Sequence, residues 1–153
     1  RDLHLSIRRQ RQMCIRDRSN MLPFRFVERM PSYDAAEAFC VRVDPKIETT
    51  KDLMKSLYFL LWFPKYFRCN WDMLAAGLRD LAWVPCPKIV LVHQRLPNIR
   101  REDLQTYLQV LRDCALGWQG DHRHDLEVVF RINDCAPIEA LLTPEQAPDA
   151  QGA

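Results

Sequence analysis

The hydrophobic pattern of the chain becomes regular only from Phe39 onward. Residues 39–44 (FCVRVD) alternate apolar and polar side chains and include β-branched residues, which predicts a strand that ends at Pro45. The almost entirely apolar run 87–93 (PKIVLVH) predicts a strand that is covered on both faces, as in a parallel sheet. Residues 124–132 (HDLEVVFRI) predict a third strand.

Three helices are predicted between these strands from apolar residues at helical spacing. The first begins after a cap at Thr49 or Thr50 and is stopped by Pro64. The second begins after a cap at Asn70, and the third lies within residues 98–118. The three apolar stripes are Leu53, Leu57, Leu60 and Leu61; Trp71, Leu74, Leu78 and Leu81; and Leu104, Tyr107, Leu108, Leu111 and Ala115.

The predicted order is strand, helix, helix, strand, helix, strand. Strands separated by helical connections favour parallel pairing through right-handed crossovers. The pattern therefore predicts an α/β fold with a three-stranded parallel sheet flanked by helices, over residues 39–133. Residues 1–38 are expected to form an N-terminal segment that is disordered and in part artefactual. Residues 134–153 are expected to form a Pro-rich tail with a disordered end.

The net charge of +2 hides an asymmetry along the chain. Residues 1–20 hold six Arg and two Asp, so this segment carries +4 and the remainder carries −2. One interpretation is a basic arm that binds nucleic acid. The other is that RRQRQMCIRDR resembles translated sequencing-adapter read-through, with Met21 as the first natural residue. On the second interpretation no nucleic-acid partner is expected.

Other classes of function are disfavoured by what the sequence lacks. No apolar run approaches the ~18–20 residues of a membrane span, and no secretory signal is visible, so a cytoplasmic protein is expected. The six cysteines are irregularly spaced, which favours reduced thiols. Only Cys114, His122, His124 and Cys135 approach a zinc-ligand spacing, too loosely to predict a metal or any other cofactor. Phosphate-loop and nucleophile motifs are lacking too, so no enzyme is predicted.

Four segments, in order, resemble the barstar family of ribonuclease inhibitors over about residues 39–132: TTKDLMKSLYFLLWFPKYFRCNWDMLAAGLRDL, PKIVLVHQ, LQVLRDCALGW and LEVVFRI. The resemblance implies the same three-stranded parallel sheet with flanking helices. It also implies an immunity-type inhibitor that covers the active site of a ribonuclease or related toxin. In such an inhibitor, carboxylates on the second helix take the place of substrate phosphates among the partner's Arg and Lys side chains.

The resemblance implies a partner-binding surface on the second helix, the loop before it and one position of the third helix. Asp72 matches the first acidic helix position of the family, and Asp113 matches a further acidic contact. Tyr66, Phe67 and Trp83 match its aromatic rim.

Three positions of this surface depart from the family pattern. Ala76 stands where the family usually has a second carboxylate, one turn after Asp72 and on the same helix face. Arg68 replaces a loop glycine, and Arg79 follows Asp72 by two turns, so the expected surface is mixed in charge. The resemblance then implies a toxin other than barnase, or weaker binding to barnase. The alternative is a non-inhibitory interaction module whose Arg68 and Arg79 meet an acidic, non-ribonuclease partner.

Several of these residues also have a purely structural interpretation. Asp72 in a first helical turn is favoured by the helix dipole, whatever it binds. Trp83 can simply cover a helix end, and Asp113 can be a solvent-facing residue of the third helix. Trp71 and Leu74 lie on the apolar stripe and are expected in the core.

Overall fold

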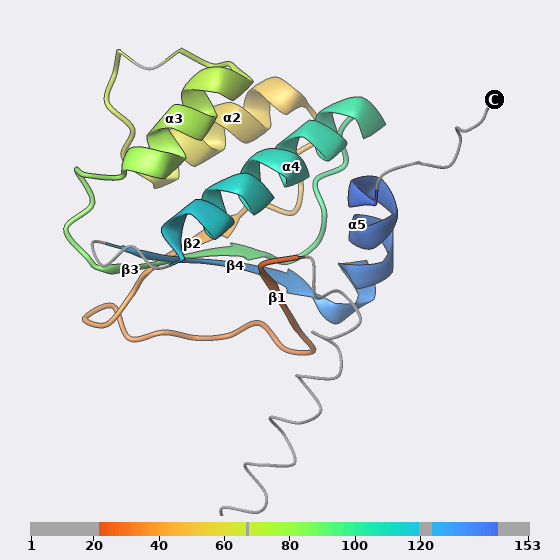
Figure 1. Cartoon of the computed structure of the whole chain (residues 1–153), viewed down its shortest axis with the longest axis horizontal. Coiled ribbons are helices and arrows are strands. Elements are labelled where there is room, and N and C mark those ends of the chain that lie inside the picture. Colours follow the sequence, from red (N-terminus) through yellow and green to blue (C-terminus); the bar gives the residue numbers. More distant parts are fainter. Residues whose placement is uncertain (1–21, 67, 120–123, 144–153) are drawn as a thin grey trace, which may run out of the picture.

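A computed structural model describes residues 22–66, 68–119 and 124–143 of the chain. The elements are, in order, β1 (Phe24–Val27), β2 (Phe39–Val43), α2 (Thr50–Leu60), α3 (Trp71–Asp80), β3 (Lys88–His93), α4 (Arg101–Trp118), β4 (Asp125–Arg131), the 3-10 turn η1 (Ile132–Asp134) and α5 (Cys135–Leu142). Helices α2, α3 and α4 cover one face of the sheet, and the connection between β1 and β2 runs along the other face (Figure 1).

The four described strands form one parallel sheet in the order β1-β4-β3-β2. The predicted parallel α/β fold is confirmed, but the predicted number of three strands was wrong. The additional strand, β1, comes from the segment that was expected to be disordered, so the sheet begins well before residue 39. It pairs with β4, with Phe24 opposite Val128 and Val27 opposite Arg131. Four residues are too few to establish a hydrophobic period, and only pairing with β4 makes this segment a strand.

Side chains alternate between the two faces of the sheet, as the pleat requires. On β3, Ile89 and Leu91 belong to the main core beneath the helices, whereas Val90 and Val92 belong to a second cluster with Val27, Ala38 and Val129. Met30 and Tyr33, from the connection between β1 and β2, pack against this second cluster. The prediction that residues 87–93 are covered on both faces is therefore confirmed for β3.

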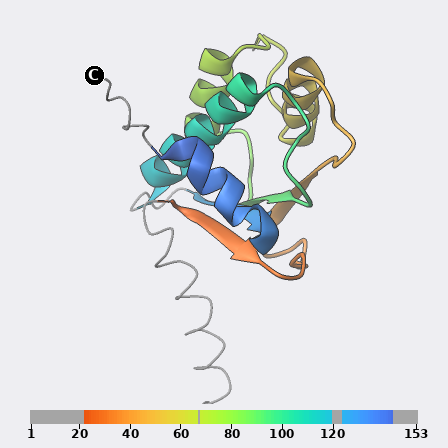
Figure 2. The same ribbon diagram turned by 90° about the vertical axis from the view of Figure 1, so that its right-hand side faces the viewer.

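The C-terminal part of the described chain is helical where a Pro-rich tail was expected. Pro137 is the third residue of α5, and a first-turn proline is tolerated because the N–H it lacks would have no partner within the helix. Ile138, Leu141 and Leu142 are buried in the main core. Gln105 of α4 donates its amide N–H to the carbonyl of Leu141 at 2.8 Å, and α5 lies beside α4 (Figure 2). The expected tail is thus corrected for α5, and residues 144–153 lie outside the described residues.

Candidate functional site

The first turn of α3 is fixed by its own sequence. The Oδ1 atom of Asn70 accepts the backbone N–H of Met73 at 2.8 Å, which confirms the predicted helix cap. Asp72 follows in the first turn, where the partial positive charge of the helix N-terminus favours a carboxylate. The side chain of Asp72 is exposed to solvent, so its charge is available to a partner.

One side of α3 is buried and the other forms a solvent-facing stripe. Leu74 and Leu78 are fully buried, as the helical spacing predicted. Asp72, Ala76 and Arg79 are all exposed and follow one another at intervals of four and three residues, which places them on one face. These three residues are called the α3 stripe below. From the N-terminal to the C-terminal end of α3, the stripe presents a carboxylate, a methyl group and a guanidinium group.

Helix α4 runs beside α3 in the same direction and holds it against the sheet. Three contacts, in matching order along both helices, join Trp71 to Tyr107 (ring centroids 6.3 Å apart), the Ala75 carbonyl to the Cys114 thiol (3.7 Å) and the Leu78 carbonyl to the Trp118 indole N–H (2.7 Å). The backbone of α3 is therefore hydrogen-bonded to α4 at its middle and near its C-terminal end, and the Trp71 ring contacts α4 near its N-terminal end. A helix fixed in this way presents its exposed stripe with little conformational freedom to lose on binding.

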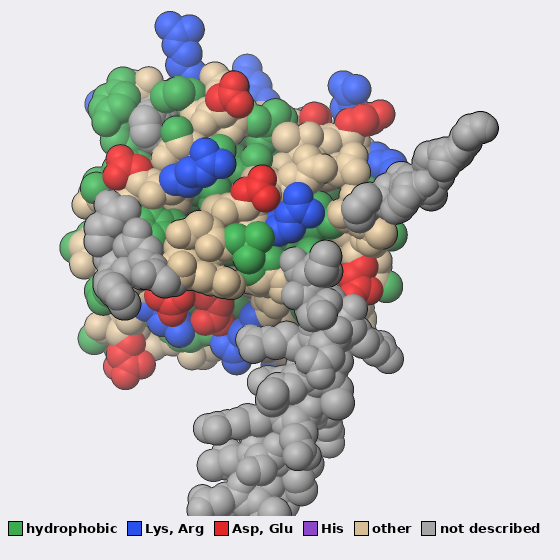
Figure 3. Space-filling view, viewed as in Figure 1, with side chains coloured by type: hydrophobic (Ala, Val, Ile, Leu, Met, Phe, Trp, Pro, Cys, Tyr) green, Lys and Arg blue, Asp and Glu red, His purple; other side chains and the backbone are tan. Residues whose placement is uncertain are grey.

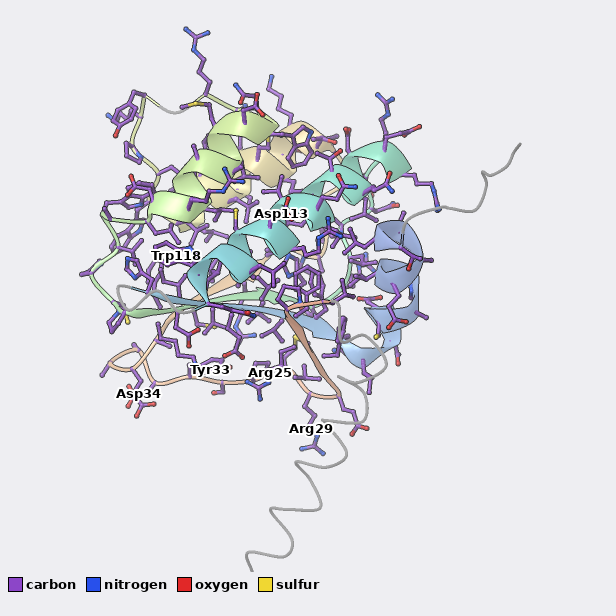
Figure 4. All side chains as sticks on the ribbon, viewed as in Figure 1. Arg25, Arg29, Tyr33, Asp34, Asp113 and Trp118 are labelled. Carbon is purple, nitrogen blue, oxygen red and sulfur yellow. The ribbon has the colours of Figure 1, made fainter. Side chains whose placement is uncertain are left out.

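Asp113 lies along the seam between α3 and α4. Burial raises the pKa of the neighbouring Cys114 thiol to about 11, while Arg79 lowers it and Asp113 raises it by smaller amounts. Asp113 also approaches Nε of Arg112 at 3.5 Å, at the solvent-exposed surface of α4 (Figure 4). The structure thus places Asp113 on the helix beside α3 (Figure 4), where its neighbour Cys114 contacts the Ala75 carbonyl, which sequence spacing alone does not show.

The aromatic residues expected to form a rim differ from one another. Tyr66 is 74% exposed on the loop before α3. Trp83 is half-buried, donates its indole N–H to the Leu61 carbonyl at 2.8 Å and meets the Phe63 ring edge-to-face at 5.3 Å. Its placement therefore supports the loop more than it offers a ring to a partner. Phe67 lies outside the described residues.

Arg68 is exposed, and its backbone carbonyl accepts the hydroxyl hydrogen of Tyr58. Its position in the loop is thus set through its backbone, which leaves the guanidinium in solvent. Two further exposed aromatic side chains, Phe59 and Trp62, were not singled out from the sequence. The sequence could have indicated their exposure, because neither residue belongs to the apolar stripe Leu53, Leu57, Leu60 and Leu61 of the first predicted helix.

Acidic and basic side chains are interspersed on the side of the molecule that carries α3 and α4 (Figure 3). Within residues 22–66, 68–119 and 124–143, His, Cys, Asp and Glu side chains form no group of three suited to hold a metal ion. Of the expected loose zinc set, His122 lies outside the described residues. Across the same ranges, no helix combines the length and apolar character that crossing a membrane requires.

A family model, Barstar (barnase inhibitor), matches residues 38–132, well over half of the chain. The chain belongs to the barstar family. Among curated proteins, none matches the sequence significantly. The α3 stripe, the preceding loop and Asp113 all lie within the matched region, whereas β1 and α5 lie outside it.

Among the described residues of this barstar-family chain, the ion pairs with the least exposed carboxylate lie on the face of the sheet opposite the helices. Glu127 of β4 accepts hydrogen bonds from Arg25 at 2.7 Å and from the Tyr33 hydroxyl at 2.9 Å, and Lys88 approaches its other oxygen at 3.2 Å. Figure 4 shows Arg25 and Tyr33 on this face of the sheet. Burial would raise the pKa of Glu127, but these three hydrogen bonds outweigh it and lower the pKa. Burial, followed by the hydrogen bond to Glu127, raises the pKa of Tyr33 to about 12. The cluster anchors the connection between β1 and β2 to the sheet.

Proposed function

We propose that this barstar-family chain is a non-catalytic protein inhibitor that binds and blocks the active site of a ribonuclease or related toxin. The observation that carries the proposal is the exposed carboxylate of Asp72 on a capped helix that is hydrogen-bonded to α4, the helix that carries Asp113 (Figure 4). A ribonuclease site is lined with cations that bind phosphate, so a rigid acidic surface is complementary to it. The thiols of Cys40, Cys69, Cys86 and Cys114 form no disulfide bond, in keeping with a cytoplasmic protein of immunity type.

The composition of the α3 stripe narrows the choice of partner. Ala76 offers no charge where the resemblance leads us to expect a carboxylate, and Arg79 would repel a cationic cleft. We therefore propose a toxin whose active site is less uniformly basic than that of barnase, or weak binding to barnase itself. Tyr66, Arg68 and Asp113 would form the edges of this interface, with Phe67 and Trp83 as further candidates.

The proposal is tested by titrating the chain into a barnase-type ribonuclease in a calorimeter while ribonuclease activity is followed in parallel. We expect the chain to bind the ribonuclease and to reduce its activity. Asp72→Asn should weaken the binding affinity and the potency of inhibition about tenfold, as loss of a charge-assisted hydrogen bond does. Asp52→Asn is the matched control, because Asp52 is also exposed in the first turn of a helix, α2. Binding that is unaffected by Asp72→Asn would contradict the role of this carboxylate.

A second candidate function is a non-inhibitory interaction module with a non-ribonuclease partner. The exposed guanidinium groups of Arg68 and Arg79 favour it, since both suit an acidic surface. A complex that survives Asp72→Ala but is lost with Arg79→Glu would select this function over inhibition. The reverse pattern would select inhibition.

A further inference from the structure

Trp62 occupies a backbone position that usually belongs to glycine. Helix α2 ends in a Schellman motif, in which the N–H of Trp62 bonds to the Phe59 carbonyl at 3.3 Å and the N–H of Phe63 bonds to the Tyr58 carbonyl at 2.9 Å. Trp62 has a φ of 60°, in the left-handed region where a side chain costs free energy that glycine avoids. The Tyr58 and Phe63 rings stack at 4.4 Å and supply the usual apolar contact of this motif.

Burial of the Trp62 ring does little to offset the free-energy cost of its left-handed backbone conformation. Its ring is 58% exposed and touches Phe39 at a centroid distance of 5.1 Å. Phe59, three residues earlier, is 79% exposed. Four large hydrophobic side chains are exposed in the described ranges, and Phe59, Trp62 and Tyr66 are three of them. Such a concentration at the end of one helix and the following loop marks a contact surface.

The charged residues of the sequence segment that carries these rings are all positive. Between Leu53 and Trp71 the sequence contains Lys55, Lys65 and Arg68 and neither Asp nor Glu. All three cations are exposed. Lys55 lies one turn before Phe59 on the surface of α2. A complementary surface therefore combines apolar and acidic side chains.

Two side-chain hydrogen bonds fix the backbone near these exposed rings. Tyr58 donates its hydroxyl hydrogen to the Arg68 carbonyl, and Trp83 donates its indole N–H to the Leu61 carbonyl at 2.8 Å. These bonds, together with the Schellman motif, order the backbone on both sides of Trp62. The exposed rings are therefore displayed by an ordered backbone, which reduces the entropy cost of binding.

We propose that Lys55, Phe59, Trp62, Lys65, Tyr66 and Arg68 form a docking surface, here called the basic aromatic edge, for an acidic protein segment that carries apolar side chains. It differs from the α3 stripe in charge and adds Phe59 and Trp62, which the family resemblance did not suggest. The inference rests on the proposed function only in taking the partner to be a protein, as expected of a barstar-family chain.

The test uses a fluorescein-labelled Glu-rich peptide with Leu and Phe side chains, titrated with the full chain and followed by fluorescence anisotropy. Binding should weaken as salt is added, since exposed charges contribute to it. The same peptide with Lys in place of Glu should not bind. Lys65→Glu combined with Arg68→Glu should weaken binding at least about tenfold, as for charges at an interface. Lys46→Glu, at an exposed lysine elsewhere, should leave binding unchanged.

Trp62→Gly separates binding from folding, because glycine is the favoured residue at this φ. Its urea midpoint should equal or exceed that of the unchanged chain, while peptide affinity falls about tenfold, the usual effect of removing an aromatic anchor. If Trp62→Gly fails to fold, the peptide affinity of Phe59→Ser, at the more exposed ring, tests the same surface. Leu116→Ser, at the exposed leucine of α4, is the matched control and should bind as before.

The inference is overturned if the acidic peptide does not bind, or if it binds equally to the Trp62→Gly and Phe59→Ser variants. It is also overturned if an oligouridine or anionic phosphatidylserine vesicles bind this edge and the peptide does not. These results are distinct from failure of the inhibitor proposal, which depends on Asp72 and a ribonuclease assay. A chain that inhibits a ribonuclease but does not bind the peptide would retain only the inhibitor interface, which is the α3 stripe with Tyr66, Arg68 and Asp113 at its edges.

Discussion

The indole N–H of Trp118 donates to the carbonyl oxygen of Leu78 at 2.7 Å and joins the last turn of α4 to the last turns of α3. The last four carbonyls of a helix have no partner within it, and Leu78 supplies one of these in α3. Nearby, His124 donates from Nε2 to the Leu81 carbonyl at 2.8 Å, and its ring meets that of Trp118 edge-to-face. Two ring N–H groups, from segments remote in sequence, thus fix the end of the helix that carries the candidate site.

Trp118→Phe should lower the free energy of unfolding by about 1–3 kcal/mol, because it leaves a buried carbonyl without this donor while it keeps an aromatic ring. Urea unfolding followed by circular dichroism measures the change. Trp62→Phe, at the exposed ring, is the control and should change stability by less than about 0.5 kcal/mol. Equal losses in the two variants would show that the indole N–H of Trp118 contributes nothing specific.

Asn70→Ala should destabilise the chain by about 1 kcal/mol, because the N–H of Met73 loses the acceptor that caps α3. Asn70→Asp should retain most of the stability, since a carboxylate caps equally well and interacts favourably with the helix dipole. Thermal and urea unfolding of the three proteins provide the comparison. If Asp proved as damaging as Ala, the side-chain cap would not be the reason for the loss.

Ala76→Asp should strengthen binding to a basic ribonuclease by about tenfold, the value of one charge-assisted hydrogen bond. Ala76 is exposed, so the new carboxylate requires no repacking, although repulsion from Asp72 one turn away costs up to about 0.5 kcal/mol of stability. Calorimetry with the same ribonuclease measures the gain, and Ala76→Asn controls for size. An unchanged affinity would contradict the charge-based account of the α3 stripe.

Glu127 should contribute an acid-dependent part of the stability. Its pKa lies below the ordinary value of 4.5, so its stabilisation is complete above that value and is lost as pH falls through the lower folded-state pKa. Glu127→Gln should cost about 1–2 kcal/mol at pH 7, since Arg25 and Lys88 lose a charged partner at a partly exposed site. The two proteins should converge once the pH has fallen through the lowered pKa of Glu127. Parallel urea titrations across pH would reveal a constant difference if this expectation were wrong.

His93 and Tyr107 form a buried hydrogen-bonded pair that should make the stability of the protein depend on pH. This dependence should lie at higher pH than that of Glu127. Nδ1 of His93 lies 3.2 Å from the Val129 carbonyl, which can only accept, so Nδ1 carries the hydrogen and Nε2 accepts from the Tyr107 hydroxyl at 2.6 Å. Burial lowers the pKa of His93 from 6.5 to about 4. The neutral ring is therefore favoured on folding, and stability should fall as pH decreases from about 6.5 to about 4, by at most about 1.4 kcal/mol per pH unit.

The double variant His93→Leu with Tyr107→Phe checks this assignment. It replaces both hydrogen-bonding partners by apolar groups, which can be nearly neutral at pH 7 when the fit is kept. Its stability should be flat over the same pH range, apart from the contribution of Glu127 below it. A slope equal to that of the unchanged chain would assign the pH dependence to other groups.

The sequence determined those features that depend on neighbouring residues. The alternation in β2, the buried run in β3, the helical stripes and the caps at Thr49 and Asn70 are set by side chains within a few positions of one another. The family resemblance likewise predicted the candidate site, residue by residue. Whether those residues bind a ribonuclease stays a prediction.

Only the tertiary structure decided which distant segments meet. The strand β1 exists because it pairs with β4, about 100 residues later, and α5 is fixed by burial of its leucines against the core. Asp113 lies on the helix beside α3 (Figure 4), and the Trp83 indole N–H donates to the Leu61 carbonyl. The exposure of Phe59 and Trp62 depends likewise on what the fold leaves uncovered. Such contacts join residues whose separation in the chain carries no periodic signal, so no local pattern could specify them.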